Sequence, residues 1–160
     1  MGAHSTVYRA IHRKTQRVVA IKHVSVGEDQ GGVPSEVLRE VACLRTLDHP
    51  NIVGLLEIHS VDLHGCSLVF EFLETSLRDV LKLLQCNGEQ MGESLIRRYS
   101  LDILRGVHAC HLSCILHRDL KPLNLLVGQG GLKIGGFSSA RFFSPHCDSC
   151  TLDIISLWYR

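Results

Sequence analysis

The sequence has almost no excess of charge of either sign. Its 17 Lys and Arg stand against 16 Asp and Glu, which gives a formal net charge of +1. So small a surplus gives no electrostatic reason to expect nucleic acid or an anionic membrane as the main partner. No apolar run approaches the roughly 18 residues that a membrane span needs, and no basic segment followed by an apolar one opens the chain. The composition therefore favours a globular protein that binds neither nucleic acid nor a membrane.

The seven cysteines are odd in number and irregularly spaced, which does not indicate a disulfide framework. Reduced thiols are typical of the cytosol and the nucleus, so we expect the protein in the nucleus, the cytoplasm or both. A zinc site is the alternative, because Cys110 and Cys114 could join the C-x-x-C pair formed by Cys147 and Cys150. The first pair lies on the apolar stripe of a predicted helix, which favours small buried side chains over metal ligands.

The length of 160 residues, 45% of them hydrophobic, suits one domain with a substantial core. The first part of the chain is rich in β-branched residues and contains one segment with helical spacing of its apolar residues. Its predicted elements are a strand hairpin over residues 5–26, a helix over residues 34–47, and strands over residues 49–61 and 66–74.

The second part has helical character, with predicted helices over residues 76–85 and 94–116 and a short glycine-turn hairpin over residues 123–134. Residues 135–160 show little periodicity and are predicted to form a loop. The apolar stripe of the longer helix consists of Ile96, Tyr99, Ile103, Val107, Cys110 and Cys114. We expect an α+β fold with a β-rich lobe over residues 1–73 and an α-rich lobe over residues 74–160 that stops early.

Phosphate transfer from ATP needs a cation at the α- and β-phosphates, a carboxylate that fixes this cation, a second carboxylate that orients the attacking hydroxyl, and ligands for Mg²⁺. The segment VAIK supplies Lys22 on a predicted strand, and REV supplies Glu40 on a predicted helix. The segment HRDLKPLN supplies Asp119 as base, Lys121 beside it, and Asn124 as an oxygen ligand for Mg²⁺. Singly, each could be an ordinary solvated or ion-paired side chain; together, they favour a nucleotide site.

The same segments make the chain resemble a eukaryotic protein kinase, and more closely a cyclin-dependent kinase. The segment GGVPSEVLRE is similar to the GVPSTAIRE helix of that family, and LDHPNIVGLLEI, LVFEFL, HRDLKPLNLL and LWYR follow in the family order. The resemblance covers essentially all 160 residues. It implies a bilobal protein-kinase-like fold with an incomplete C-terminal lobe, and transfer of the γ-phosphate of ATP to Ser or Thr of a protein substrate.

The resemblance also implies the roles of individual residues. Lys22 and Glu40 would position ATP, Asp119 would orient the substrate hydroxyl, and Lys121 would help to neutralise the phosphate. The other implied nucleotide contacts are the glycine-loop residue Gly2, the adenine-packing residues Val7, Ala20 and Leu126, the gatekeeper Phe70, and the hinge residues Glu71, Phe72 and Leu73. Gly2 also fits the N-myristoylation pattern M-G-x-x-x-[ST], which arises easily by chance.

The regulatory residues of the cyclin-dependent kinases have counterparts here as well. In that family three arginines hold a phosphothreonine of the activation segment, and the matching positions are Thr151, Arg39, Arg118 and Arg141. Guanidinium groups pair well with the nearly two negative charges of a phosphate. The resemblance further implies a cyclin-like partner, which would dock on the helix and push Glu40 toward Lys22.

The pattern departs from the family at the metal site. The DFG motif of kinases matches Gly136-Phe137-Ser138, so a glycine stands where the metal-binding aspartate would be. Asn124 would be the one remaining ligand, and we expect Mg²⁺ binding to be weakened because the ion requires near-octahedral oxygen coordination. Ser5 stands at the third glycine of the glycine-rich loop, where a Cβ restricts the approach of backbone amides to phosphates.

Three hypotheses follow from these residues. The first is a cyclin-dependent-kinase-like Ser/Thr protein kinase domain that uses ATP and Mg²⁺. The second is a catalytically impaired pseudokinase or binding module, which the glycine at position 136 favours. The third is a non-functional kinase fragment, which the early ends of the kinase pattern favour.

Overall fold

The computed structural model describes residues 5–25, 33–62 and 65–143 of the chain. The predicted sites at Gly2, Thr151, Cys147 and Cys150 therefore lie outside the described residues. Among the described residues, no helix has the length and apolar character needed to cross a membrane.

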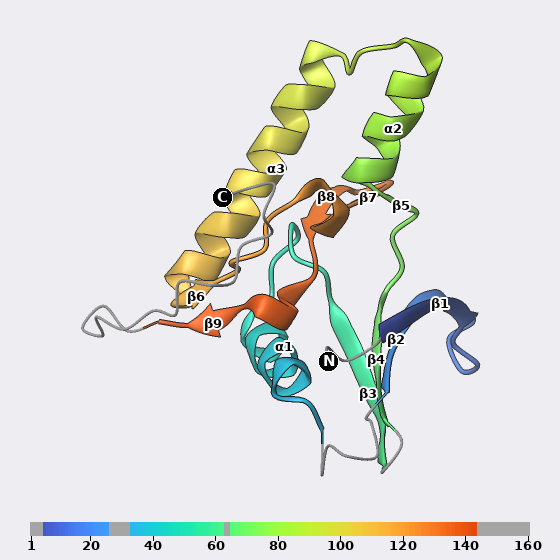
Figure 1. Ribbon diagram of the computed structural model, residues 1–160, viewed down its shortest axis with the longest axis vertical. Coiled ribbons are helices and arrows are strands. Elements are labelled where there is room, and N and C mark those ends of the chain that lie inside the picture. Colours follow the sequence, from blue (N-terminus) through green and yellow to red (C-terminus); the bar gives the residue numbers. More distant parts are fainter. Residues whose placement is uncertain (1–4, 26–32, 63–64, 144–160) are drawn as a thin grey trace.

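The first part of the molecule is a four-stranded antiparallel sheet in the order β1-β2-β4-β3 (Figure 1). The predicted hairpin over residues 5–26 is present as two antiparallel strands. The polar turn between them is closed by the His12 amide, which donates to the Arg17 carbonyl at 2.8 Å. The strands are β1 (Ser5–Ile11), β2 (Val18–Ser25), β3 (Leu55–Asp62) and β4 (Gly65–Glu71). The strands therefore form where the sequence is rich in β-branched and aromatic side chains.

One helix, α1 (Ser35–Thr46), accompanies this sheet. It begins directly after Pro34, whose carbonyl accepts hydrogen bonds from the Val37 and Leu38 amides. Its buried residues are Val37, Glu40, Cys43 and Leu44. Three of them are apolar and spaced for one helical face, so the helix is held by burial of that face, and Glu40 is carried into the interior with it.

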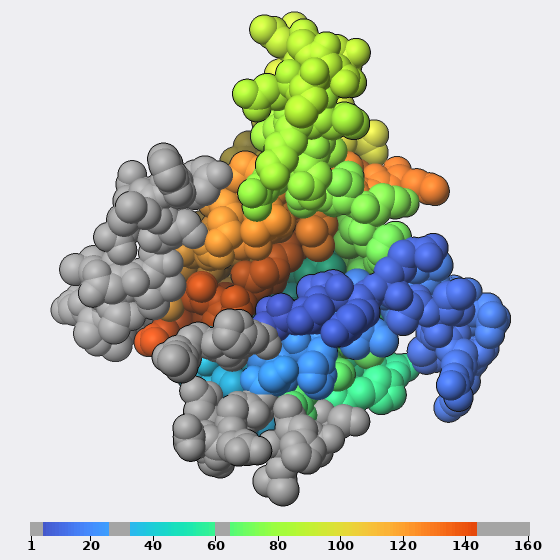
Figure 2. Space-filling model, turned by 45° about the vertical axis from the view of Figure 1, so that its right-hand side comes forward, coloured from blue at the N-terminus to red at the C-terminus, as the bar shows by residue number. Residues whose placement is uncertain are grey.

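The second part contains the helices α2 (Leu77–Asn87) and α3 (Glu93–Leu112), which follow one another in the chain and project from the molecule (Figure 1). Figure 2 shows the same end, in yellow-green, standing clear of the rest. Short elements connect these helices to the sheet. They are β5 (Thr75–Ser76), β6 (Ile115–Leu116), η1 (Pro122–Asn124), β7 (Leu125–Gly128), β8 (Gly131–Ile134), η2 (Phe137–Ser139) and β9 (Arg141–Phe142).

The apolar stripe predicted for the long helix needs a correction at both ends. The helix ends at Leu112, and Cys114 follows with a φ of +54° and an exposed side chain. Ile96 is 49% exposed. Only Cys110 of the cysteine pair is a buried small side chain, because Cys114 belongs to the turn that leaves the helix. The loop predicted after residue 135 also contains two short elements, η2 and β9.

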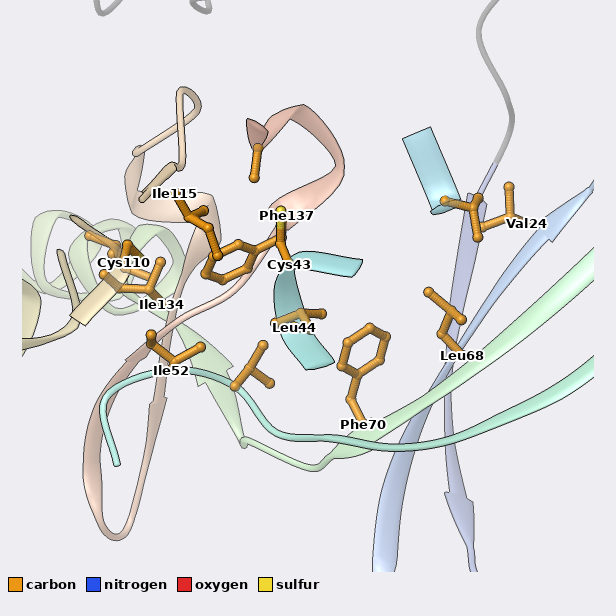
Figure 3. Packing of buried hydrophobic residues seen from close by; sticks show 14 of the residues in the cluster. Val24, Cys43, Leu44, Ile52, Leu68, Phe70, Cys110, Ile115, Ile134 and Phe137 are labelled. Atoms are coloured by element: carbon orange, nitrogen blue, oxygen red, sulfur yellow. The ribbon is translucent and has the colours of Figure 1, made fainter. Parts of the chain in front are cut away.

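One hydrophobic core joins the two parts of the molecule. Phe137 has no exposed surface and lies among buried residues from both parts, including Cys43, Leu44 and Ile115 (Figure 3). The segment before β3 is tied to β8 by backbone hydrogen bonds, with the Val53 amide donating to Ile134 at 2.9 Å. The relative position of the sheet and the later segments is therefore set by packing and by main-chain pairing.

Candidate active site

A buried ion pair joins the sheet to α1. Lys22 lies on β2, and its Nζ is 2.6 Å from Oε2 of Glu40 on α1. The Glu40 side chain is almost completely buried, whereas that of Lys22 keeps 18% of its surface exposed. Because Glu40 can hold the ammonium while one end of it stays accessible, the pair could present a fixed positive charge to an anionic ligand.

The inward position of α1 depends on Phe137. The helix contacts η2, and Cys43 and Leu44 of α1 belong to the same buried cluster as Phe137. Burial raises the pKa of the Cys43 thiol, which is consistent with a dry interior at this contact. Glu40 therefore reaches Lys22 because apolar packing holds its helix against the segment that follows Gly136.

The second group of polar side chains lies between β6 and β7. Nζ of Lys121 is 2.8 Å from Oδ2 of Asp119. The amide nitrogen of Asn124 donates to the same oxygen at 2.9 Å and to the Asp119 backbone carbonyl at 2.8 Å. The carboxylate of Asp119 is thus oriented by two neighbours from its own loop, as a group that receives a proton must be.

His117 fixes the backbone of this loop. Its Nε2 donates to the Gly135 carbonyl at 2.8 Å, and its Nδ1 accepts from the Asp119 amide at 3.3 Å. Its ring meets the edge of Phe137 with centroids 4.7 Å apart. Burial lowers the pKa of His117, so the neutral ring that can both donate and accept is the stable form. Its place in the HRD segment does not by itself indicate this role, because both hydrogen-bond partners are backbone groups.

The residues around Gly136 do not fit a Mg²⁺ ion. Gly136 has no side-chain oxygen, and the side-chain nitrogen of Asn124 donates to Asp119, which leaves Oδ1 as the one ligand atom of Asn124. A Cβ placed on Gly136 would lie 2.5 Å from Cγ of Asn124, so a longer side chain there would require the Asn124 side chain to move. Mg²⁺ requires several oxygen ligands in near-octahedral geometry. We therefore derive no chemical step through a metal at this position.

The residues expected around an adenine are distributed over both parts of the molecule. Ala20 on β2 pairs with Phe70 on β4, whose ring is buried, while Val7 on β1 is 63% exposed. Figure 2 shows β1, in dark blue, open at the surface. Leu126 lies on β7 and packs against the core from the second part. The structure thus places these side chains on the elements expected, and their nucleotide contacts stay predictions.

The expected hinge is braced by contacts that the sequence did not reveal. Glu71 accepts two hydrogen bonds from Nζ of Lys133 at 2.7 Å and one from the Gly54 amide at 2.7 Å. The Arg9 guanidinium lies over the Phe72 ring, 5.4 Å from its centroid. Leu73, the third hinge residue, is half-buried. A lysine 62 residues away carries no local sequence signal for pairing with Glu71.

Two of the three expected phosphate-binding arginines face one hollow. Arg39 and Arg141 line a cavity of about 270 Å³ together with Phe142. Nε of Arg39 is buried, and among the described residues it has no hydrogen-bond partner. Arg118 is bonded to the segment that lines this hollow. Its Nε donates to the carbonyl of Ser139 at 2.9 Å, and the next residue, Ala140, is part of the lining. The hollow is therefore lined by two guanidinium groups, one of which, Arg39, also pairs with Glu36 at 3.5 Å.

The zinc hypothesis finds no support in the described residues. Within them, no three His, Cys, Asp or Glu side chains are grouped as metal ligands. Burial raises the pKa of the Cys110 thiol to about 11, which opposes the thiolate form that zinc binds. Cys114, by contrast, is exposed at the surface.

A comparison with protein families gives one match over the whole sequence. The model described as "Protein kinase domain" matches residues 1–160. The match thus includes the Lys22–Glu40 pair, the loop of Asp119, Lys121 and Asn124, and Gly136.

Proposed function

This chain belongs to the protein kinase family, with an α+β bilobal fold, and from that premise we propose that it is a domain of the cyclin-dependent type. In this proposal it binds ATP and transfers the γ-phosphate to Ser or Thr of a protein substrate. Protein kinases in general use ATP together with Mg²⁺. The observation that carries the proposal is the 2.6 Å pair of Lys22 and Glu40, which gives the site a fixed charge for phosphate oxygens.

The reaction assigns separate roles to the two polar groups. Lys22, held by Glu40, binds the α- and β-phosphates of ATP. Asp119 accepts the hydrogen bond of the substrate hydroxyl and orients its oxygen toward the γ-phosphate. Lys121, 2.8 Å from Asp119, balances the negative charge that develops on the transferred group. Positioning and charge stabilisation are the main contributions a protein makes to phosphoryl transfer.

The regulation proposed for this domain uses the hollow beside α1. A phosphate on Thr151 would bind Arg39 and Arg141, with Arg118 as the third guanidinium, because Arg39 and Arg141 line the same hollow. A cyclin-like subunit would dock on α1. This part of the proposal rests on the resemblance of the segment GGVPSEVLRE to the cyclin-binding helix of that family.

Gly136 favours a second candidate function, a pseudokinase that binds a nucleotide or a partner without transferring phosphate. A bound metal ion stabilises the charge of the transition state by roughly several kcal/mol, and loss of the metal-binding carboxylate removes a contribution of that order. Nucleotide binding through Lys22 does not need that carboxylate. The two candidates therefore share the ATP site and differ in the chemical step.

The test combines binding and transfer on one protein. We expect ATP to raise the melting temperature of the wild type, and Lys22→Met to remove this shift. Transfer of labelled phosphate to a Ser/Thr peptide mixture, above the level of Asp119→Ala, would support the kinase. A shift with transfer no higher than that of Asp119→Ala would support the pseudokinase. The absence of any ATP-dependent shift would overturn the kinase and the nucleotide-binding pseudokinase alike.

A further inference from the structure

The four-stranded sheet has a second face, called the outer face below, which the candidate active site does not use. Neighbouring residues of a strand point to opposite faces of the sheet, so Ile21 lies on the face opposite to that of Lys22. The antiparallel register adds one residue from each other strand to the row of Ile21, namely Tyr8, Val69 and Glu57. A ligand on the outer face is therefore separated from Lys22 by the thickness of the sheet.

A cavity of about 310 Å³ lies on this outer face, beside the turn between β1 and β2. Side chains from three strands give it an apolar lining, namely Ala10, Val19, Ile21 and Val69. Ile11 also lines the cavity, and this large aliphatic side chain is 59% exposed. In Figure 1 the turn itself projects at the edge of the sheet. Binding pockets for small molecules measure roughly 300–1,000 Å³, so this volume suits one or two side chains of a partner.

The rim of the cavity carries positive charge. Arg13 and Lys14 of the turn line it, and both residues are exposed. Among the described residues, neither side chain forms an ion pair. The whole turn, residues 12–17, has the sequence HRKTQR and contains no acidic residue. Its cations are therefore available to an anionic partner.

Glu57 is the one acid among the described residues that line the cavity, and two histidines bind its carboxylate. Nε2 of His12 lies 3.2 Å from Oε1, and Nε2 of His59 donates to Oε2 at 2.7 Å. Nδ1 of His12 accepts from the Thr15 amide at 3.2 Å, so the proton directed at Glu57 is on Nε2. Because both oxygens are engaged, Glu57 does not neutralise the two cations of the turn, and the rim keeps a positive charge.

We propose that this cavity is a docking site for an acidic segment of a partner protein, in which one apolar side chain is flanked by Asp or Glu. The apolar side chain would pack against Ile11 and Ile21, and the acidic ones would pair with Arg13 and Lys14. Nucleic acid fits less well, because its binding draws on several phosphate contacts at once, and an apolar lining gives it nothing to bind. This inference goes beyond the proposed function and does not depend on it.

The charge of the rim is tested with labelled peptides and the full chain, by fluorescence anisotropy. The first probe is a short peptide of Asp and Glu around a central Leu, and the second replaces each acid by its amide. We expect the wild type to bind the acidic probe at least about tenfold more tightly than the amide probe. The double variant Arg13→Glu, Lys14→Glu should lose most of this preference. No binding of the acidic probe, or equal binding by wild type and variant, would overturn the proposal.

The matched control for net charge is the double variant Lys82→Glu, Arg105→Glu. These residues are exposed on α2 and α3, and their reversal changes the net charge of the protein by the same amount. We expect less than about a twofold change in affinity, because salt screens charges that lie far from the bound peptide. A loss as large as that of the turn variant would show that the peptide responds to net charge and not to the cavity.

The apolar contact has its own pair of variants. Ile11→Ser should weaken binding of the Leu probe by about threefold or more, and should hardly affect a probe with Ala in place of Leu. Leu104→Ser, on α3, is the control, since that side chain is 63% exposed and lies outside the cavity. If the Leu and Ala probes bind equally well to the wild type, the cavity does not take an apolar side chain and the proposal is wrong.

Two competitors distinguish this site from the alternatives. ATP should not displace the acidic probe, and Lys22→Met should bind the probe as the wild type does. Displacement by ATP would place the probe in the nucleotide site and overturn this proposal. If ATP fails to bind and the probe still binds, the proposed function falls and this one stands. A single-stranded oligonucleotide of equal length that binds more tightly than the acidic probe, and loses affinity in the turn variant, would assign the cavity to nucleic acid instead.

Discussion

The two polar groups of the candidate site differ in how fully they match the residues of a protein kinase. On the side of β2 and α1, Lys22 and Glu40 form an ion pair whose carboxylate is buried. On the side of the loop around Asp119, a glycine replaces the carboxylate that a kinase uses for metal, and the Asn124 side chain fills the space next to it. The Lys22–Glu40 pair therefore matches the kinase pattern in full, whereas the loop side lacks one metal-binding carboxylate but keeps the buried Phe137.

Phe137 shows that these two properties can be separated within adjacent residues. It follows Gly136 directly and has no exposed surface, since it lies against α1 and the His117 ring. The segment therefore still performs its structural task of holding α1 inward, although its first residue offers no side-chain ligand.

The largest effect is expected from removing that shared contact. Phe137→Ala should lower the free energy of unfolding by about 3–5 kcal/mol, because it leaves a large cavity between α1 and the later segments. Phe142→Ala, on a ring that is 52% exposed, should cost less than about 1 kcal/mol. Urea denaturation measures both. Equal losses would show that Phe137 does not connect the two sides.

Breaking the ion pair should have the next largest effect. Lys22→Met leaves the buried Glu40 carboxylate without its cation, which should cost about 3 kcal/mol of unfolding free energy, the lower end for buried pairs because Lys22 is partly exposed. Lys22→Met combined with Glu40→Leu should recover most of the loss, since no uncompensated charge remains. The same denaturation experiment would contradict this if the double variant were the less stable one.

The sequence was sufficient for most elements of the fold. Four strands, α1, α2, α3 and the β7–β8 hairpin lie where periodicity and turn residues predict them. Lys22 and Glu40, which each lie in a segment that fits the kinase pattern, form an ion pair in the structure, and their roles toward ATP stay predictions. The division into lobes at residues 73 and 74 stays a prediction.

Contacts between distant segments were beyond the sequence. Cys114 continues the helical spacing, yet the chain turns at Ser113 and exposes it, a choice that helical periodicity does not encode. The close approach of the Asn124 side chain to Gly136 depends on the rotamer in which Asn124 bonds to Asp119, and no spacing rule specifies that rotamer. The missing carboxylate was evident, but the amide that fills its place required coordinates.

Asp102 supports the segment that leads to Gly136, and its loss should have the third largest effect. Asp102 on α3 is buried, and its Oδ2 accepts from the Leu132 amide on β8 at 3.0 Å. Leu132 lies four residues before Gly136 in the chain. Asp102→Ala leaves this amide unsatisfied and should cost about 2 kcal/mol of unfolding free energy. Glu93→Ala, which removes an exposed ion pair with Arg97 on the same helix, should cost less than about 0.5 kcal/mol. Similar losses in the two variants would contradict the prediction.

The smallest expected effect is a dependence of stability on pH. It should arise from His117, which bonds the loop of Asp119 to Gly135. Burial holds the pKa of this side chain below the 6.5 of the unfolded chain, so between those two values the unfolded state binds more protons than the folded one. The stabilising contribution of the neutral ring is present above pH 6.5 and is lost as pH falls through this window. Its slope is at most about 1.4 kcal/mol per pH unit.

His117→Gln should therefore reduce the difference in unfolding free energy between pH 7.5 and pH 5.5, measured by urea denaturation at each pH. His108→Gln, on an exposed position of α3, should leave that difference unchanged and corrects for the other histidines. Protonation at Nδ1 would also remove the acceptor that holds the Asp119 amide at 3.3 Å. Acid should then loosen the loop of Asp119 before it affects the Lys22–Glu40 pair, which contains no histidine. An unchanged pH dependence in His117→Gln would place the acid-sensitive contact elsewhere.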